Sequence, residues 1–392
     1  MNSIKNISFH NKKALIRVDF NVPFEGDRIS DNSRIAAAIP TINYVLENGG
    51  SCIVMSHLGR PKKREQKFSL IKVKQELERL LNRPVVFVEN CIGTEAKKAS
   101  QVLIPGEVLL LENLRFYKEE TAGDEKFAEE LSSLADIYIN DAYGTTHRAH
   151  ASTSTIAKYF SLKSPGILLE KEILSLKKVL QSPKKPVTAI VGGAKVSSKI
   201  SIIANMLMVI DNLVIGGGMA YTFILSSGGK VGDSICEPEN SGHCKEILDL
   251  AKKNNVKIFL PIDVVVSKSF SNNDKQKEVD IQKIPDGWQG LDIGTKTRQK
   301  FSDVIKQSST LLWNGPMGVF EMPSFQNGTK AVANAVAEAT KKGSFSLVGG
   351  GDSVAAIKKF KLQDKISFIS TGGGAMLESL EGKILPGIKA LQ

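Results

Sequence analysis

The sequence predicts an α/β protein with two doubly wound parallel-sheet (Rossmann-like) domains, joined by an interdomain helix and hinge. Three observations predict this fold class. Short apolar, β-branched runs alternate with amphipathic stretches in both halves of the chain, as in repeated βαβ units. The 392 residues, 42% of them apolar, exceed the usual size of one domain. A helical stretch bounded by prolines, within residues 162–186, separates the two series of strands.

The first half contains five predicted strands with helical stretches between them. Residues 14–18 (ALIRV) form the first strand, a helix is expected at about 33–48, and residues 52–56 (CIVMS) form the second strand. The runs VVFV, VLLL and IYIN follow in order. Ligands of parallel sheets bind at the carboxyl ends of the strands, so the loops directly after these runs are the expected functional segments.

Arginine and histidine recur in the loops after these strands. Arg60, Arg115 and Arg148 each follow a different strand, and Arg34 begins the first predicted helix. A planar guanidinium group matches phosphate and carboxylate oxygens two at a time. A single loop arginine is usually only solvated, but recurrence in successive βα units predicts a site for a small, multiply charged anion.

The second half repeats the strand and helix alternation with glycine-rich loops. Glycine triplets begin at Gly216, Gly349 and Gly372, each directly after or close to an apolar run. Lys195 and Lys199 lie four positions apart at the opening of another predicted helix. Glycine lets the backbone approach a phosphate and present amides of a helix N-terminus to it. Neither the GxxxxGK[ST] nor the GxGxxG motif is present, so the loops predict a nucleotide site of another design.

The net charge of +11 favours acidic partners, and nucleic acid is one of them. The densest basic run, residues 61–67, contains no aromatic residue for base stacking, and small anionic ligands explain the charge at least as well. No apolar stretch approaches the roughly 18 to 20 residues of a membrane span, and the N-terminus lacks the apolar segment of a secretory signal. We therefore expect a cytoplasmic protein without a membrane or a specific nucleic acid as partner.

The four cysteines are spaced too widely for a typical metal motif. Cys52 and Cys91 stand alone, and Cys236 and Cys244 show no CxxC spacing. His243 adjoins Cys244, but two neighbouring residues without further ligands rarely bind a metal. Reduced thiols are the expected state.

Nine segments, in order and spacing, resemble the phosphoglycerate kinase family, and the resemblance runs from near residue 14 to the end. The segments are VDFNVP (18–23), SHLGRP (56–61), ENLRF (112–116), NDAYGTTHRAHAS (140–152), VGGAKVSSKI (191–200), GGGMAYTF (216–223), WNGPMGVFE (313–321), GGGDS (349–353) and STGGGA (370–375). Three departures remove no charged group: Tyr143 replaces a common phenylalanine, Thr146 a common alanine, and Ile167 with Leu168 a more usual aromatic pair.

The resemblance implies a reversible phosphoryl transfer between ATP and 3-phosphoglycerate, giving ADP and 1,3-bisphosphoglycerate, in glycolysis and gluconeogenesis. It implies Mg²⁺ as Mg-ATP or Mg-ADP, no tightly bound organic cofactor, and a monomer. The implied domains are an acid-binding domain at 1–165, an interdomain helix and hinge at 166–186, and a nucleotide-binding domain at 187–377. The tail, at about 378–392, is expected to pack back on the first domain.

The resemblance also assigns site residues by position. The acid is expected to contact the ten residues Asp19, Phe20, Asn21, Arg34, His57, Leu58, Gly59, Arg60, Arg115 and Arg148. The nucleotide is expected to contact Gly193, Ala194, Lys199, Gly217, Gly290, Pro316, Glu321, Gly350, Gly351, Asp352 and Ser353, with Asp352 near the metal. The implied catalytic residues are Arg34, Lys195 and Gly351.

Such a reaction needs in-line positioning and neutralised charge, because a carboxylate is already a nucleophile and requires no general base. With the two ligands on different domains, hinge closure is the expected step before transfer. Two alternatives remain at this point. A nicotinamide-dependent dehydrogenase shares the doubly wound fold but needs the dinucleotide fingerprint that is missing here. A nucleic-acid-binding protein is the other, because of the positive charge.

Overall fold

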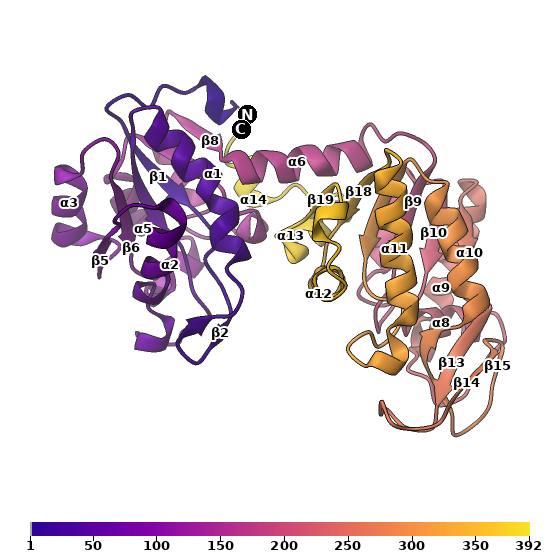
Figure 1. Ribbon diagram of the computed structural model, residues 1–392. Coiled ribbons are helices and arrows are strands. Elements are labelled where there is room, and N and C mark those ends of the chain that lie inside the picture. The colour runs from indigo at the N-terminus through magenta and orange to yellow at the C-terminus, as the bar shows by residue number, and fades with distance from the viewer. Residues whose placement is uncertain (1) are drawn as a thin grey trace. The chain divides into compact units, whose positions relative to one another are not determined.

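The computed structural model describes residues 2–392, which divide into two compact units (Figure 1). Unit 1 runs to Ile173 and takes in Ile384–Gln392, and unit 2 is Leu174–Lys383. A six-stranded parallel sheet forms the centre of each unit, which confirms the predicted fold class. Helix α6 (Ile167–Leu180) is continuous from one unit to the other.

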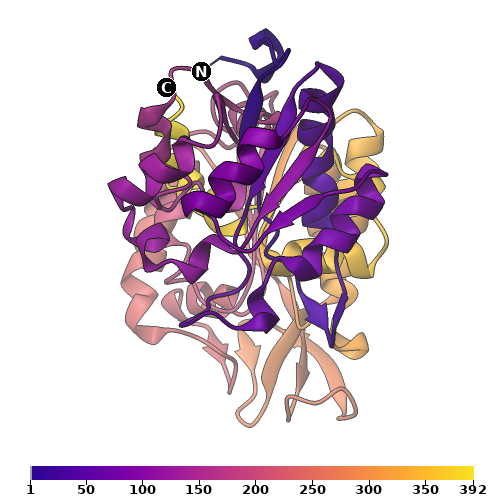
Figure 2. The ribbon, with the colours of Figure 1, turned by 90° about the vertical axis from the view of Figure 1, so that its left-hand side faces the viewer.

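The sheet of unit 1 has the strand order β5-β6-β4-β1-β7-β8, and every neighbouring pair is parallel. Its strands are β1 (Lys13–Arg17), β4 (Ser51–Met55), β5 (Val86–Val88), β6 (Val108–Leu111), β7 (Ile137–Asn140) and β8 (Lys163–Pro165). Helices lie on both sides of this sheet (Figure 2). This explains why β4 and β6 are buried along their whole length and read as continuous apolar runs.

The helices of unit 1 connect these strands and cover their faces. They are α1 (Ser33–Glu47), α2 (Ile71–Leu81), α3 (Gly93–Val102), α4 (Lys118–Ala122), α5 (Glu125–Ser132) and the C-terminal α14 (Pro386–Lys389). A small hairpin of β2 (Phe24–Glu25) and β3 (Arg28–Ile29) precedes α1. The core between α1, α2 and the sheet contains Ile16, Ile42, Val54, Leu77 and Leu110, all fully buried.

The sheet of unit 2 has the order β12-β10-β9-β17-β18-β19 and is also parallel throughout. Its strands are β9 (Val187–Val191), β10 (Asn212–Ile215), β12 (Lys257–Phe259), β17 (Thr310–Asn314), β18 (Phe345–Val348) and β19 (Phe368–Ile369). The apolar run at 366–370 yields only the two residues of β19, because this edge strand pairs with β18 alone. The inner strands β9 and β17 are buried completely.

Unit 2 also contains a three-stranded antiparallel sheet that the sequence pattern did not predict. Its order is β14 (Gln276–Asp280), β13 (Asp263–Ser267) and β16 (Gln289–Ile293). Strand β14 has the sequence QKEVD and is exposed at four of five positions, so it lacks the apolar run that marks a strand. A two-stranded pair, β11 (Lys230–Val231) and β15 (Lys283–Ile284), lies in the same part of the chain.

The remaining helices of unit 2 follow its strands. They are α7 (Ile200–Met206), α8 (Met219–Ser226), α9 (Ser241–Lys253), α10 (Thr295–Lys306), α11 (Asn327–Lys341), α12 (Gly351–Lys359) and α13 (Gly373–Leu380). Helices α7, α8 and α12 begin at or just after the glycine-rich loops, so their N-termini border the predicted nucleotide site. Within residues 2–392, no helix combines the length and apolar character needed to cross a bilayer.

Candidate functional site

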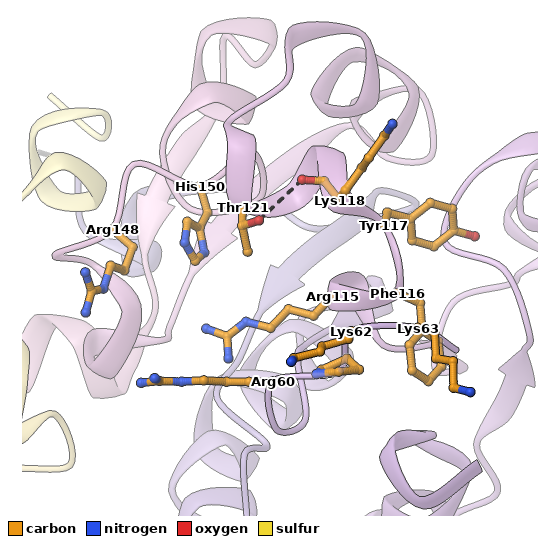
Figure 3. Close-up of a pocket in the computed structure, with 11 residues that line it drawn as sticks. Arg60, Lys62, Lys63, Arg115, Phe116, Tyr117, Lys118, Thr121, Arg148 and His150 are labelled. Atoms are coloured by element: carbon orange, nitrogen blue, oxygen red, sulfur yellow. Dashed lines mark hydrogen bonds between the residues drawn. The ribbon is translucent and has the colours of Figure 1, made fainter. Parts of the chain in front are cut away.

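The loops at the carboxyl ends of the unit 1 strands surround a basic pocket of about 500 Å³. Figure 3 shows Arg60, Arg115 and Arg148 directing their guanidinium groups toward the same space, with His150 beside them. The three arginines therefore converge, as their positions after successive strands predicted. The pocket is also lined by Pro61, Lys62, Lys63, Phe116, Tyr117, Lys118 and Thr121.

A short 3₁₀ turn after β6, Leu114–Phe116, fixes Arg115. The buried side chain of Asn113 caps this turn by accepting a hydrogen bond of 3.0 Å from the amide of Arg115. At its other end, Arg115 Nη1 donates to the carbonyl of Gly59 at 2.7 Å. Burial, followed by the charge of Arg17, lowers the pKa of Arg115 to about 10. A bound anion stabilises positive charges that lie this close together.

The loop after β4 is held to the loops after β1 and β6 by hydrogen bonds between its backbone and asparagine side chains. The amide of Gly59 donates to Asn21 Oδ1 at 2.8 Å, and Asn113 Nδ2 donates to the carbonyl of Leu58 at 2.8 Å. Gly59 has a φ of +63°, and an added Cβ would lie 2.5 Å from the ring of Phe68. Only glycine therefore fits this corner of the site.

Arg34 and Asp19 form an ion pair at the start of α1. Arg34 Nη1 lies 3.3 Å from Asp19 Oδ1 and donates to the carbonyl of Asn21 at 2.8 Å. The side chain of Arg34 remains 37% exposed, so part of the guanidinium group stays available to a ligand. In contrast, Phe20 and Leu58 are buried and can offer a ligand little beyond their backbone.

Two histidines of unit 1 are held neutral by their surroundings. Burial, followed by the charge of Arg17, lowers the pKa of His57 well below its usual value. Burial, followed by the charge of Arg115, lowers the pKa of His150 to about 4. Both rings therefore act near neutral pH as hydrogen-bonding groups and not as cations.

Sequence reasoning missed several residues of this region. Lys62, Lys63 and Lys118 line the pocket, although none of them was among the residues predicted to contact the acid. Arg17 and Glu120 are completely buried behind it. An arginine inside the otherwise apolar strand ALIRV was the one signal that could have drawn attention to Arg17.

Unit 2 contains a cavity of about 580 Å³ between the glycine loops and the antiparallel sheet. Its walls are largely apolar, as expected for a site that holds an aromatic base. The predicted residues among its lining are Gly193, Ala194, Gly217, Gly290, Pro316, Glu321 and Asp352. The sequence analysis missed Gly218, Tyr221, Ile235, Phe270, Gln289, Leu291, Met317, Gly318 and Val319, which come from several different loops and elements.

A second cavity of unit 2, of about 370 Å³, shares Gly193, Ala194 and Asp352 with the first. It is lined in addition by Lys195, Ser198, Lys199, Asn314, Gly315, Gly350, Gly351, Ser353 and Leu377. All eleven residues predicted for the nucleotide line one of these two cavities, and Lys195 lies with them. An apolar cavity that shares part of its wall with one lined by lysines and glycines can hold a nucleoside beside its phosphates.

Lys199 is anchored to backbone and side-chain oxygens of this second cavity. Its Nζ donates to the carbonyl of Gly192 at 2.7 Å, the carbonyl of Asn314 at 3.1 Å and Asn314 Oδ1 at 2.5 Å. Burial lowers the pKa of Lys199 to about 8, while the charge of Asp352 raises it. Gly350 has a φ of +95°, and an added Cβ would lie 2.4 Å from Asn314 Nδ2.

Asp352 lies in the first turn of α12, is exposed, and lines both cavities. Within residues 2–392, no group of three or more histidine, cysteine or acidic side chains could hold a metal ion. A single carboxylate beside a phosphate loop fits Mg²⁺, which commonly binds through one or two carboxylates together with substrate phosphates.

Comparison with known proteins gives a consistent result along the chain. The sequence model of the family described as phosphoglycerate kinase matches residues 4–383. The phosphoglycerate kinase of Moorella thermoacetica is 50% identical over 390 residues, which cover 99% of this chain and 98% of the relative. That of Herpetosiphon aurantiacus is 49% identical over 391 residues, with coverage of 99% and 98%.

Solved structures of the same description also match. Phosphoglycerate kinase from Coxiella burnetii has a TM-score of 0.92 and 40% identity, and covers 100% of this chain and 98% of its own. Phosphoglycerate kinase from Pyrococcus horikoshii OT3 has a TM-score of 0.86 and 32% identity, with the same coverage.

Proposed function

The chain belongs to the phosphoglycerate kinase family, and from this premise we propose how its two ligand sites carry out the reaction. It is a kinase with 3-phosphoglycerate as substrate (EC 2.7.2.3), and the role of the family is glycolytic. What remains to be assigned is which residues of this chain bind each substrate, where Mg²⁺ binds, and how the phosphoryl group is transferred.

In the proposed acid site, Arg60, Arg115 and Arg148 hold the phosphate and carboxylate oxygens of 3-phosphoglycerate. The convergence of these three guanidinium groups in one pocket supports the assignment. Arg34 approaches the acid from α1, steadied by its contact with Asp19. The other proposed contacts are Asn21 and His57 through their side chains, and Phe20, Leu58 and Gly59 through their backbone.

In the proposed nucleotide site, the larger cavity of unit 2 holds the base and ribose and the smaller one holds the phosphates. Lys199 and the amides of residues 350–353 face the phosphates, because the N-terminus of α12 opens into the smaller cavity. Asp352 would hold Mg²⁺ together with the nucleotide, and the ion would neutralise phosphate charge.

The proposed chemistry is a single in-line displacement. A carboxylate oxygen of 3-phosphoglycerate forms a bond to the γ-phosphorus, while the bond from that phosphorus to the bridging oxygen breaks and ADP leaves with the electron pair. Arg34, Lys195 and the amide of Gly351 neutralise charge on the moving group. The protein need not remove a proton, because the nucleophile is already ionised at neutral pH.

Transfer requires the reacting atoms to come within about 3 to 3.5 Å, and the two proposed sites belong to different compact units. We therefore propose that the units close on one another, through the 166–186 segment, when both substrates are bound. We further propose a cytoplasmic monomer without a specific nucleic acid partner.

The observation that carries this proposal is the agreement between the residues and the cavities: all eleven predicted nucleotide residues line two cavities that share part of their walls, and the three strand-end arginines line one pocket. The test is a coupled assay of ATP consumption with 3-phosphoglycerate in the presence of Mg²⁺. The account predicts activity that requires all three components. Activity that persists without the acid or without Mg²⁺ would contradict it.

A further inference from the structure

Arg17, the last residue of β1, is a completely buried cation close to the acid site. Each nitrogen of its guanidinium group has a partner. Nε donates to Ser152 Oγ at 2.8 Å, Nη1 donates to the carbonyl of Val18, and Nη2 lies 3.2 Å from Nδ1 of His57. Burying an unpaired charge costs several kcal/mol, so such a residue is held in place by its environment and in turn orients the groups it contacts.

The contact with His57 determines which ring nitrogen carries the proton. A guanidinium group can only donate hydrogen bonds, so Nδ1 of His57 must accept one from Arg17 and cannot carry a hydrogen itself. The proton of the neutral imidazole therefore resides on Nε2. Within residues 2–392, Nε2 has no hydrogen-bond partner, and it is not among the partnerless polar atoms that are sealed from solvent. His57 as a whole is 3% exposed, so its Nε2–H is placed to be used by a ligand and not by bulk solvent.

The other side of Arg17 is held by Ser152 and Glu120, which are both completely buried. Ser152 Oγ accepts from Arg17 Nε and therefore points its own hydrogen at Glu120 Oε1, at 2.6 Å. The amide of Ser152 donates to Glu120 Oε2 at 2.9 Å. Every donor in this chain of contacts has one orientation, with the arginine donating in both directions and the carboxylate accepting at the end.

We propose that Arg17 is a positioning residue for the acid site: it fixes His57 as the Nε2–H tautomer, so that a neutral ring presents a donor to the oxygen atoms of the substrate. All oxygens of a carboxylate or an ionised phosphate accept hydrogen bonds, so the opposite tautomer would turn an acceptor toward them. Ser152 and Glu120 keep Arg17 aimed at Nδ1. This inference rests on the proposed place of His57 in the acid site.

The decisive experiment reads the tautomer directly, on the full-length enzyme without substrates. Two-bond ¹H–¹⁵N correlation spectra distinguish protonated from unprotonated ring nitrogens, and a His57→Gln variant identifies the His57 signals among the five histidines. We expect Nε2 of His57 to be protonated and Nδ1 to be unprotonated in the unaltered enzyme. Protonation at Nδ1 would overturn the proposal without any variant.

The test variant is the double substitution Arg17→Met with Glu120→Gln, because removing the arginine alone would leave Glu120 buried without a cation. We expect the His57 signals to show a mixture of tautomers, and the KM for 3-phosphoglycerate to rise about tenfold while the KM for ATP stays unchanged. The matched control is Arg83→Met. Arg83 is an arginine of unit 1 that is only partly buried, and its Nη1 donates to the carbonyl of Gly106, away from His57. Arg83→Met should change neither the tautomer of His57 nor the KM for 3-phosphoglycerate.

Two outcomes contradict the proposal. If His57 keeps a single Nε2–H tautomer in the folded double variant, Arg17 does not set the tautomer. If the tautomers mix but the KM for the acid does not change, the position of the proton on the His57 ring has no role in binding the acid. An error in the proposed acid site would give a different result. The His57→Gln variant would then bind 3-phosphoglycerate normally, while His57 of the unaltered enzyme would still be protonated at Nε2.

Discussion

The two proposed ligand sites differ in the chemical groups that line them. In unit 1, charged side chains form the pocket, and Arg34 and Arg115 are held by hydrogen bonds to Asp19 and to backbone carbonyls. In unit 2, most of the lining consists of glycine backbone and apolar side chains, with Lys199 as the buried cation. In the proposed assignment, the first site would recognise its ligand by charge and the second mainly by shape and backbone amides.

This difference determines how each site can be damaged. A site of side chains loses a specific contact when one side chain is shortened, and the loss is largest where that contact stabilises the transition state. A site of glycine backbone amides cannot be damaged by shortening a side chain, because glycine has none. It can be damaged by an added Cβ, which would collide with neighbouring atoms.

The largest effect is expected for Arg34→Ala. Arginines that neutralise charge on a moving phosphoryl group contribute roughly 10³- to 10⁵-fold to turnover, so kcat should fall by about three orders of magnitude or more. Steady-state kinetics at saturating substrates measures this. Arg34→Lys, which keeps the charge but not the planar fork, should retain more activity than Arg34→Ala. Near-normal turnover of a folded Arg34→Ala enzyme would remove this residue from the mechanism.

The next effect separates the two ligands. Lys199→Ala should weaken ATP binding about 10- to 100-fold, because hydrogen bonds to charged groups contribute about 1.5 to 3 kcal/mol, and should leave 3-phosphoglycerate binding intact. Arg148→Ala should do the reverse. Calorimetric titration of each variant with each ligand checks both halves. Equal damage to one and the same ligand by both substitutions would contradict the assignment of one ligand to each unit.

A smaller effect is expected when a methyl group is added to the backbone site. Gly350→Ala places a Cβ 2.4 Å from Asn314 Nδ2 at a φ of +95°. Strain of this kind costs about 1 to 3 kcal/mol, so the KM for ATP should rise roughly tenfold while the KM for the acid is unchanged. Gly343→Ala is a matched control, since that glycine has a φ of +101° with no atom within 4 Å of the added Cβ. A normal KM for ATP in Gly350→Ala would show that the loop geometry is not needed.

The smallest effect concerns the pH dependence of stability. It can be measured in both units, because each contains a buried carboxyl group with a raised pKa. Asp141 in unit 1 is completely buried and accepts a hydrogen bond from the amide of Leu169 at 3.0 Å, at the start of α6. Burial raises the pKa of Asp141 to about 7, although its hydrogen bonds lower it. Burial likewise raises the pKa of Asp292 in unit 2 to about 7.

Because the folded state binds these protons more tightly than the unfolded state, the stability that they contribute is complete below about pH 4 and is lost as pH rises from there to the folded-state pKa of about 7. Asp141→Asn should therefore flatten the decline in the free energy of unfolding of unit 1 between about pH 4 and 7, by a few kcal/mol at most. Denaturant titration at several pH values measures this, with Asp292→Asn as the counterpart in unit 2. An unchanged pH dependence in Asp141→Asn would show that this carboxyl does not titrate in that range.

Sequence reasoning performed unequally on the two units. The parallel sheets were predictable because strands such as β4 and β17 are buried throughout and appear as unbroken apolar runs. The convergence of the arginines was predictable, because the carboxyl ends of parallel strands meet at one edge of the sheet. The antiparallel sheet was not, since β14 is polar and exposed. The apolar walls of the nucleotide cavity, including Phe270 and Ile235, carry no local signal, because only tertiary packing brings them together.

Arg17 shows a further limit of pattern reading. Its position in β1 was evident. Ser152, which accepts its hydrogen bond, and Glu120, which accepts from Ser152, lie more than a hundred residues away in the chain, at separations that no local motif encodes. The role of such a residue depends on which atom faces which, and that information exists only in the folded structure.

The central claim is that each unit binds one substrate and that both substrates together bring the units into the reactive arrangement. Small-angle scattering tests it most directly, by measuring the radius of gyration of the free enzyme, of each binary complex, and of the ternary complex with an unreactive ATP analogue. The account predicts a partial decrease at most with either ligand alone, and the smallest radius with both. An identical radius in all four states, with binding confirmed by calorimetry, would contradict it.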